Sequence, residues 1–101
     1  MRVTLLYPVW TGDYGLFGHF ARRASVWPPT NLALLAAVAE QYGHDVTIID
    51  GEVERLSQDQ LVDGALATNP DLIGLTAYSP FFHLNVELAT ALKSRAPQIP
   101  I

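Results

Sequence analysis

The chain has 101 residues, half of them hydrophobic and 16% charged, which predicts a single folded domain with a substantial core and argues against disorder. Its formal net charge of −4, with six basic residues spread along the chain, argues against nucleic acid or an anionic membrane as a partner. The absence of cysteine excludes disulfides, thiolate catalysis and cysteine-ligated clusters within these residues, and it is compatible with the cytoplasm, where we expect the protein to reside.

The chain opens with a predicted strand and a long connection. Val3 to Tyr7 is a short run of apolar and β-forming residues that Pro8 ends, so it predicts a strand and not a signal peptide. The run does not alternate cleanly, which favours a strand buried on both faces of a parallel sheet. Residues 8–27 are rich in glycine and aromatic side chains. A structureless connection of this length is more often functional than idle.

A first helix follows this connection. Pro28-Pro29 predicts its start, with Thr30 and Asn31 as alternative cap residues. The residues that follow are apolar nearly all round, which predicts a largely buried helix. Gly43 is expected to end it in a left-handed conformation.

The middle of the chain predicts a second strand and a second helix. Val46–Ile49 forms the strand, which leads into Asp50-Gly51-Glu52. Ser57 and Gln60 have the spacing of a capping box at the start of the helix, and a Pro at position 70 ends it.

The last third repeats the same alternation. Leu72–Thr76 predicts a third strand, and a third helix then runs to Pro97. Ile99-Pro100-Ile101 resembles the beginning of a fourth strand. Alternating strands and helices predict an α/β fold, with a flavodoxin-like or Rossmann-like open parallel sheet and helices on both faces. We interpret residues 1–101 as the N-terminal part of such a domain, truncated at the start of strand four.

The carboxyl ends of the strands are the expected site. Open α/β sheets bind ligands there, near the point where the strand order reverses. In the flavodoxin-like order 2-1-3, the connection after Tyr7 and the loop at residues 76–82 flank one crevice. Thr76, Tyr78 and Ser79 offer hydroxyl groups there, and aromatic rings and glycines suit a large, partly apolar cofactor. Gly74 lies inside the third strand, where glycine often marks a close contact.

Other residues at this edge have two interpretations each. Asp50 closes the second strand where many folds bind ribose hydroxyls, but acidic residues there are also common as turn caps. Tyr78 and Phe81-Phe82 either line the crevice or pack against the third helix. Of the histidines, only His19 is placed to reach the crevice, whereas His83 is expected to face solvent.

Several kinds of site have no support in the sequence. We find no metal-ligand spacing, Ser/His/Asp set or close carboxylate pair, so we predict no catalytic residue and no metal ligand. The glycines at 12, 15 and 18 do not match the dinucleotide fingerprint and lie too far past the first strand, which disfavours an NAD site.

Ordered motifs in both halves of the chain resemble one known family. Residues 28–38 and 43–50 read Pro-Pro-x-Asn-Leu-Ala-Leu-Leu-Ala-Ala-Val and Gly-His-Asp-Val-x-Ile-Ile-Asp. Residues 69–76 and 87–101 read Asn-Pro-Asp-Leu-Ile-Gly-Leu-Thr and Glu-Leu-Ala-x-x-Leu-Lys-x-x-x-Pro-x-Ile-Pro-Ile. Together they resemble the N-terminal cobalamin (B12)-binding domain of class B radical S-adenosylmethionine proteins, a group that includes anaerobic magnesium-protoporphyrin monomethyl ester cyclases and methyltransferases.

The resemblance implies a cofactor and a division of labour. It implies that cobalamin is held at the carboxyl edge of the sheet, with its nucleotide tail between strands one and three and Thr76 placed to hydrogen-bond that tail. The radical chemistry, with its [4Fe–4S] cluster and S-adenosylmethionine, is expected in a C-terminal domain absent from this chain. We therefore expect a corrinoid and that radical domain as partners, and no catalysis by these residues alone. The residues and the resemblance together give nine candidate cofactor-binding residues: Pro8, Val9, Trp10, Asp50, Gly51, Gly74, Thr76, Tyr78 and Ser79.

One departure and two alternatives accompany this hypothesis. Many cobalamin-binding domains ligate cobalt through Asp-x-His-x-x-Gly after strand one, but Asp13 here precedes Gly15 where the histidine would stand. A first alternative is a domain of the same family that has lost cobalamin and only shapes the substrate pocket. A second is a receiver-like or flavin-binding signalling domain, which is disfavoured because receivers need an aspartate where Thr76 stands.

Overall fold

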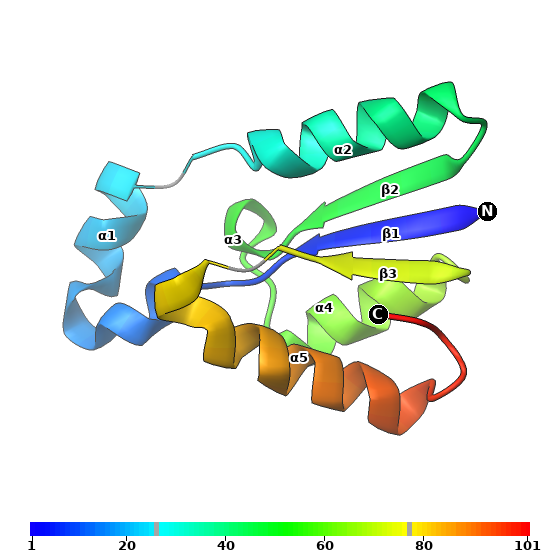
Figure 1. The fold of residues 1–101 in the computed structure, drawn as a ribbon. Coiled ribbons are helices and arrows are strands. Elements are labelled where there is room, and N and C mark those ends of the chain that lie inside the picture. The colour runs from blue at the N-terminus through cyan, green and yellow to red at the C-terminus, as the bar shows by residue number, and fades with distance from the viewer. Residues whose placement is uncertain (26, 77) are drawn as a thin grey trace.

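The computed structural model describes residues 1–25, 27–76 and 78–101, and it has an open parallel sheet with helices on both faces (Figure 1). The strands are β1 (Arg2–Tyr7), β2 (Asp45–Asp50) and β3 (Leu72–Leu75), in the order β2-β1-β3. The α-helices are α1 (Gly18–Ser25), α2 (Thr30–Gln41), α3 (Gly51–Glu54), α4 (Gln58–Ala67) and α5 (Phe82–Arg95). The predicted α/β fold and the order 2-1-3 are confirmed.

The register of the sheet aligns the ends of its strands. Tyr7 in β1 lies opposite Asp50 in β2, and Leu6 lies opposite Leu75 in β3. Because all three strands are parallel, the loops that follow them emerge at one edge of the sheet. The loops that follow β1 and β3, which were predicted to flank one crevice, therefore emerge from neighbouring strands.

One face of the sheet is covered by α4 and α5 (Figure 1). Ser57 and Gln60 form the predicted capping box at the start of α4, which fixes where that helix begins. The core on this face consists of closely packed aliphatic side chains that are almost completely buried. They are Leu6, Ile49, Leu61, Val62, Ala65, Ile73, Leu88 and Leu92.

Of the described helices, α2 covers the other face (Figure 1). Gly43 has the predicted left-handed backbone, with φ of 84°, directly after the helix. The prediction of a largely buried helix is wrong in part. Leu34 is 69% exposed and Leu35 is 53% exposed, because the sheet covers only one side of a helix that is apolar nearly all round.

The connection after β1 is more ordered than the sequence suggested. It contains the 3-10 segment η1 (Thr11–Phe17), which kinks at Gly15, and then α1. Arg22 and Arg23 lie in the last turn of α1, where cations interact favourably with the helix dipole. A second 3-10 segment, η2 (Ser79–Phe81), leads into α5. The expectation of a structureless connection over residues 8–27 is therefore wrong.

The last residues of the chain run back beside β3 (Figure 1). The N–H of Ile73 donates a hydrogen bond to the carbonyl of Pro100 at 3.0 Å. Residues 99–101, which were expected to begin a fourth strand, form no strand in the structure, and this bond attaches them to the side of β3 that faces away from β1.

Candidate functional site

An open groove lies between α2 and the end of β3. Its volume is about 530 Å³. Its lining is apolar apart from two residues at one end, and consists of Asn31, Leu32, Leu34, Leu35, Val38, Leu75 and Thr76. The exposed side of α2, which the sequence predicted to be buried, is one wall of this groove.

The polar end of the groove is a hydrogen-bonded pair. Asn31 Nδ2 donates to Thr76 Oγ1 at 2.7 Å, and Thr76 is only 8% exposed. The pair joins the first turn of α2 to the residue that follows β3. Because its oxygen accepts the amide hydrogen, the Thr76 hydroxyl still has its own proton to donate. The sequence predicted a role for Thr76 at this edge, but it indicated Asn31 only as a possible helix cap.

Gly74 shapes the floor of the same face. A Cβ atom at this position would lie 2.6 Å from Cδ2 of Leu5, which is shorter than any ordinary contact. Gly74 and Thr76 are two residues apart in an extended segment, so they face the same side of the sheet. The absence of a side chain at Gly74 therefore leaves room for Leu5, which packs on the same face of the sheet as Thr76.

A second hollow, at the carboxyl edge of the sheet, is lined by aromatic rings. It has a volume of about 290 Å³ and is lined by Tyr7, Trp10, Trp27, Tyr78 and Phe81. The rings of Tyr7 and Tyr78 meet edge to face at 6.4 Å, and those of Trp10 and Phe81 lie 5.4 Å apart. The loops after β1 and β3 thus meet through aromatic contacts, which are favourable in these offset geometries.

Tyr7 lies at the base of this hollow and was not among the predicted site residues. It is only 6% exposed. This burial raises the pKa of the Tyr7 phenol, and the nearby Tyr78 raises it further by a smaller amount. The alternation of β1 could have identified it, because Val3, Leu5 and Tyr7 share the α2 face of the sheet. Trp27 was also missed, since nothing in its local sequence shows that it borders the same hollow as Tyr7.

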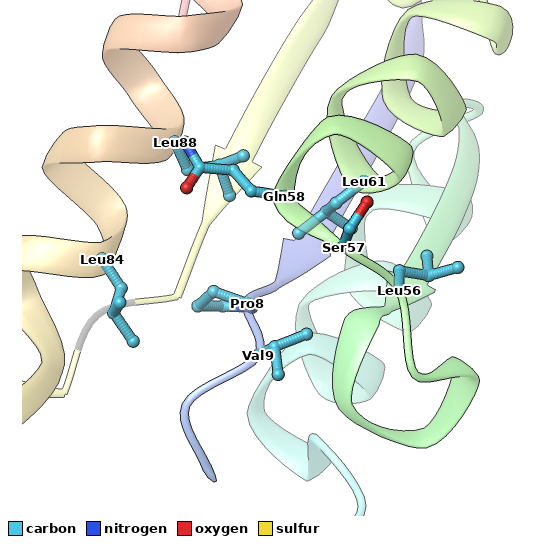
Figure 2. A pocket seen from close by; sticks show the side chains of 8 residues that line it. All are labelled: Pro8, Val9, Leu56, Ser57, Gln58, Leu61, Leu84 and Leu88. Atoms are coloured by element: carbon cyan, nitrogen blue, oxygen red, sulfur yellow. The ribbon is translucent and has the colours of Figure 1, made fainter. Parts of the chain in front are cut away.

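Pro8 and Val9 line a different hollow from the one that Trp10 lines. Figure 2 shows both side chains facing a pocket between the start of α4 and the start of α5, on the other side of the sheet. This pocket has a volume of about 230 Å³ and is otherwise lined by Leu56, Ser57, Gln58, Leu61, Leu84 and Leu88. The structure therefore does not bring Pro8 and Val9 together with Thr76 and Tyr78.

Asp50 and Gly51 lie at the end of β2, where both contact main-chain atoms. Asp50 Oδ1 accepts hydrogen bonds at 3.0 Å from the N–H groups of Glu52 and Val53, which makes Asp50 the cap of α3. A Cβ atom on Gly51 would lie 3.0 Å from the carbonyl oxygen of Tyr7. Of the two interpretations of Asp50, the structure supports the turn cap.

The carboxylate of Glu52 holds the connection after β1 in place. Glu52 is 1% exposed and accepts hydrogen bonds from the backbone N–H of Thr11, at 3.0 Å, and from its hydroxyl. Arg22 Nη2 donates to the Thr11 hydroxyl at 3.2 Å and lies 3.9 Å from Glu52 Oε2. This cluster joins η1 and α1 to α3, and neither Glu52 nor Thr11 was predicted to have a role.

A second link joins η1 to α5. Asp13 Oδ2 lies 2.6 Å from Nε2 of His83, whose side chain is 54% exposed. His83 thus faces solvent in part, as expected, but it also contacts the connection after β1. His19 and Ser79 are exposed residues, on α1 and at the start of η2 respectively.

The described parts of the chain contain neither a cluster of metal ligands nor a membrane-spanning helix. Within residues 1–25, 27–76 and 78–101, no three His, Asp or Glu side chains are grouped so that they could hold a metal ion. In the same ranges, no helix combines the length and the apolar character needed to cross a bilayer.

Comparison with known proteins identifies the family. The family model of the B12-binding domain matches residues 19–101. The anaerobic magnesium-protoporphyrin IX monomethyl ester cyclase of Rubrivivax gelatinosus is 35% identical over 81 residues, which cover 79% of this chain but only 14% of that protein. No solved structure matches the chain significantly. Because the family match extends over most of the chain, the chain belongs to the B12-binding domain family.

Proposed function

We propose that this domain binds cobalamin at the carboxyl edge of its sheet. In this proposal the nucleotide tail enters the groove between α2 and β3, and the corrin ring lies over the loops that follow β1 and β3. Thr76 donates its hydroxyl proton to the tail, and Asn31 orients that hydroxyl. The observation that carries the proposal is the hydrogen bond from Asn31 to the buried Thr76 hydroxyl, at the end of an otherwise apolar groove.

The chemistry of the groove fits such a group. A tail that carries an aromatic base has flat apolar surface for the aliphatic lining and polar atoms for one oriented hydroxyl. The aromatic hollow with Trp10 and Tyr78 adjoins the loops over which a flat macrocycle would lie. Asp50 and Gly51 support these loops through the backbone, whereas Pro8 and Val9 contribute the turn that leaves β1.

We further propose that the domain belongs to a radical S-adenosylmethionine enzyme of the cytoplasm. The relative of 35% identity is a cyclase, and the chain covers 14% of its length. Its [4Fe–4S] cluster and S-adenosylmethionine would bind in a C-terminal domain that follows this one. In this proposal residues 1–101 hold the corrinoid and present it to that domain, and they catalyse no reaction alone.

Cofactor retention tests the proposal. The intact protein is mixed with hydroxocobalamin and desalted, and the retained corrin is measured by its visible absorbance. We expect about one corrinoid per protein. Replacing Thr76 by phenylalanine should weaken the affinity for cobalamin at least about tenfold and so lower retention, because the ring would fill the polar end of the groove and remove the hydroxyl. The corresponding loss of binding free energy is about 1.4 kcal/mol or more.

A matched control uses the other side of the molecule. Thr90→Phe changes an exposed threonine on α5 whose hydroxyl bonds only to its own helix, at the carbonyl of Val86. This variant should retain cobalamin like the unmodified protein. Absence of retention by the unmodified protein would contradict the proposal, and so would equal retention by Thr76→Phe.

The cobalamin-free alternative makes the opposite prediction. A domain that only shapes the substrate pocket would retain no corrinoid, and Thr76→Phe would alter substrate turnover alone. The groove favours cobalamin, because a purely structural wall has no need of a hydroxyl oriented toward an open hollow. A receiver-like function is disfavoured, since Thr76 stands at the carboxyl end of β3 where a phospho-accepting aspartate would be required.

A further inference from the structure

The aromatic hollow at the carboxyl edge is bordered by rings from several directions. Every described residue that lines it is aromatic: Tyr7, Trp10, Trp27, Tyr78 and Phe81. The rings of Tyr7 and Tyr78 stand almost at right angles, with an interplanar angle of 89°, so they form two walls of a corner. Trp10 and Phe81 add a second pair, with ring centroids 5.4 Å apart and planes inclined by 38°. The hollow therefore presents ring surface on more than one side.

Negative charge surrounds the base of this hollow. The face of an aromatic ring carries negative charge density, and no described lining residue is basic. Burial is the largest cause that raises the pKa of the Tyr7 phenol, and the carboxylates of Asp50 and Glu52 also contribute to the rise. Carboxylates act in this direction because their field disfavours a further negative charge. Arg22 lies 3.9 Å from Glu52 and offsets part of that charge, but Arg22 does not line the hollow.

We propose that the aromatic hollow binds a small organic cation with a methylated onium centre, either a quaternary ammonium or a sulfonium. Such a centre has no N–H or O–H to donate, so proteins hold it against the faces of aromatic rings, whose quadrupole attracts the charge. The volume of about 290 Å³ lies at the lower end for small-molecule sites and suits a compact head group. The bound cation would also cover part of Trp27, which is 72% exposed.

A neutral apolar group is the main alternative occupant of the hollow. It would gain the same burial of ring surface, but no attraction from the rings or from the carboxylates of Asp50 and Glu52. The proposal does not rest on cobalamin, because the rings and these carboxylates belong to the chain itself. Its failure would therefore leave the cofactor proposal standing.

Choline and its neutral carbon analogue separate the two occupants. In the analogue a tert-butyl group replaces the trimethylammonium group, so the shape is kept and the charge is lost. Both tryptophans of the chain, Trp10 and Trp27, line the hollow, so the fluorescence of the intact, cobalamin-free protein reports on its occupancy. We expect a saturable change with choline and a Kd at least about tenfold lower than that of the analogue. No saturable change with choline, or equal affinity for both compounds, would overturn the proposal.

Tyr78→Leu and Tyr78→Phe test whether the ring is required. Tyr78 is 49% exposed, so the fold should tolerate both changes. Leucine removes the ring, so the affinity for choline should fall at least about threefold while that for the neutral analogue stays the same. Phenylalanine keeps the ring face and should keep the affinity for choline. An equal loss for both compounds in Tyr78→Leu, or no loss for either, would overturn the proposal.

The matched control for these variants is Tyr42→Leu. Tyr42 is 79% exposed and follows the end of α2, and it does not line the hollow. Its replacement should change the affinity for neither compound. A loss of choline binding in this variant as large as that in Tyr78→Leu would place the cation elsewhere and overturn the proposal.

Tetramethylammonium and trimethylsulfonium distinguish the two sources of an onium centre. Both are titrated against the same tryptophan fluorescence in the intact, cobalamin-free protein. The tighter of the two identifies the class of the natural ligand, as a quaternary ammonium or a sulfonium. Failure of both to bind would overturn the proposal, because each presents the methylated charge that the rings are proposed to recognise.

Discussion

The two faces of the sheet are built from similar residues but are closed to different degrees. On the face of α4 and α5, the aliphatic side chains of two helices and three strands are almost completely buried. On the face of α2, a single helix covers Val3, Leu5 and Tyr7, and the rest of its apolar surface borders an open groove. The difference indicates that the first face stabilises the domain and that the second one is available to a ligand.

Removing a side chain from each face tests this comparison most directly. Leu88 is 1% exposed, so Leu88→Ala should lower the free energy of unfolding by about 2–5 kcal/mol through lost burial and a cavity. Leu35 is 53% exposed, so Leu35→Ala should change it by less than about 0.5 kcal/mol. Urea denaturation followed by circular dichroism measures both. An equally large loss for Leu35→Ala would show that its face is covered in solution.

The floor of the open face gives a second test, with a smaller effect. Gly74→Ala would bring a Cβ atom to 2.6 Å from Leu5, so the free energy of unfolding should fall by about 2–3 kcal/mol as the leucine is displaced. The control is Gly12→Ala, where an added Cβ meets no atom within 4 Å. Urea denaturation should separate the two variants. If Gly74→Ala left the free energy of unfolding unchanged, Leu5 would not be closely packed against Gly74.

The two faces also differ in how far the sequence predicts them. The closed face follows from local patterns, since alternating strands and helices with a capping box at Ser57 determine which leucines turn inward. The groove could be located only coarsely, at the carboxyl edge of the sheet. Thr76 follows from the strand pattern, but its contact with Asn31 joins residues that are 45 positions apart, and no local pattern encodes such a distance.

The connection after β1 was the least predictable region for the same reason. Its glycines and aromatic residues favoured a loop, yet it folds into η1 and α1 because Glu52 binds Thr11 from 41 residues away. An acidic residue after a strand is usually a cap or a solvated side chain, and here Asp50 is the cap. Burial of Glu52 depends on how the connection folds back over α3, which periodicity does not reveal.

Thr11→Val tests whether this cluster orders the open face. The variant keeps the shape of the side chain but removes the hydroxyl that donates to the buried Glu52 carboxylate and accepts from Arg22, so stability should fall by about 1–2 kcal/mol. The chain has two tryptophans, Trp10 and Trp27, and both lie in this connection. Their fluorescence should therefore change at lower urea concentration than the circular dichroism of the domain. Thr47→Val, at an exposed position of β2, is the control and should leave the two transitions coincident.

The smallest expected effect lies at the opposite edge of the sheet, where β1 and β3 begin. The backbone N–H of Arg2 donates to Asp71 Oδ2 at 2.8 Å, and this bond, with the Arg2 guanidinium, lowers the pKa of Asp71 from its usual 3.8. A lowered pKa in the folded state means that the carboxylate stabilises the fold above pH 3.8 and loses this contribution as the pH falls through the folded value.

Asp71→Asn should therefore reduce stability slightly at neutral pH and leave it unchanged in strong acid. The Asp71 side chain is 45% exposed, so solvent and salt screen its interaction with Arg2 and the difference should shrink as ionic strength rises. Thermal unfolding of both proteins between pH 7 and about pH 2 measures it. A difference that does not vary with pH would mean that the charge of Asp71 contributes nothing. Because Asp71 lies at the amino ends of the strands, its loss should not change cobalamin retention, whereas substitutions at Thr76 should.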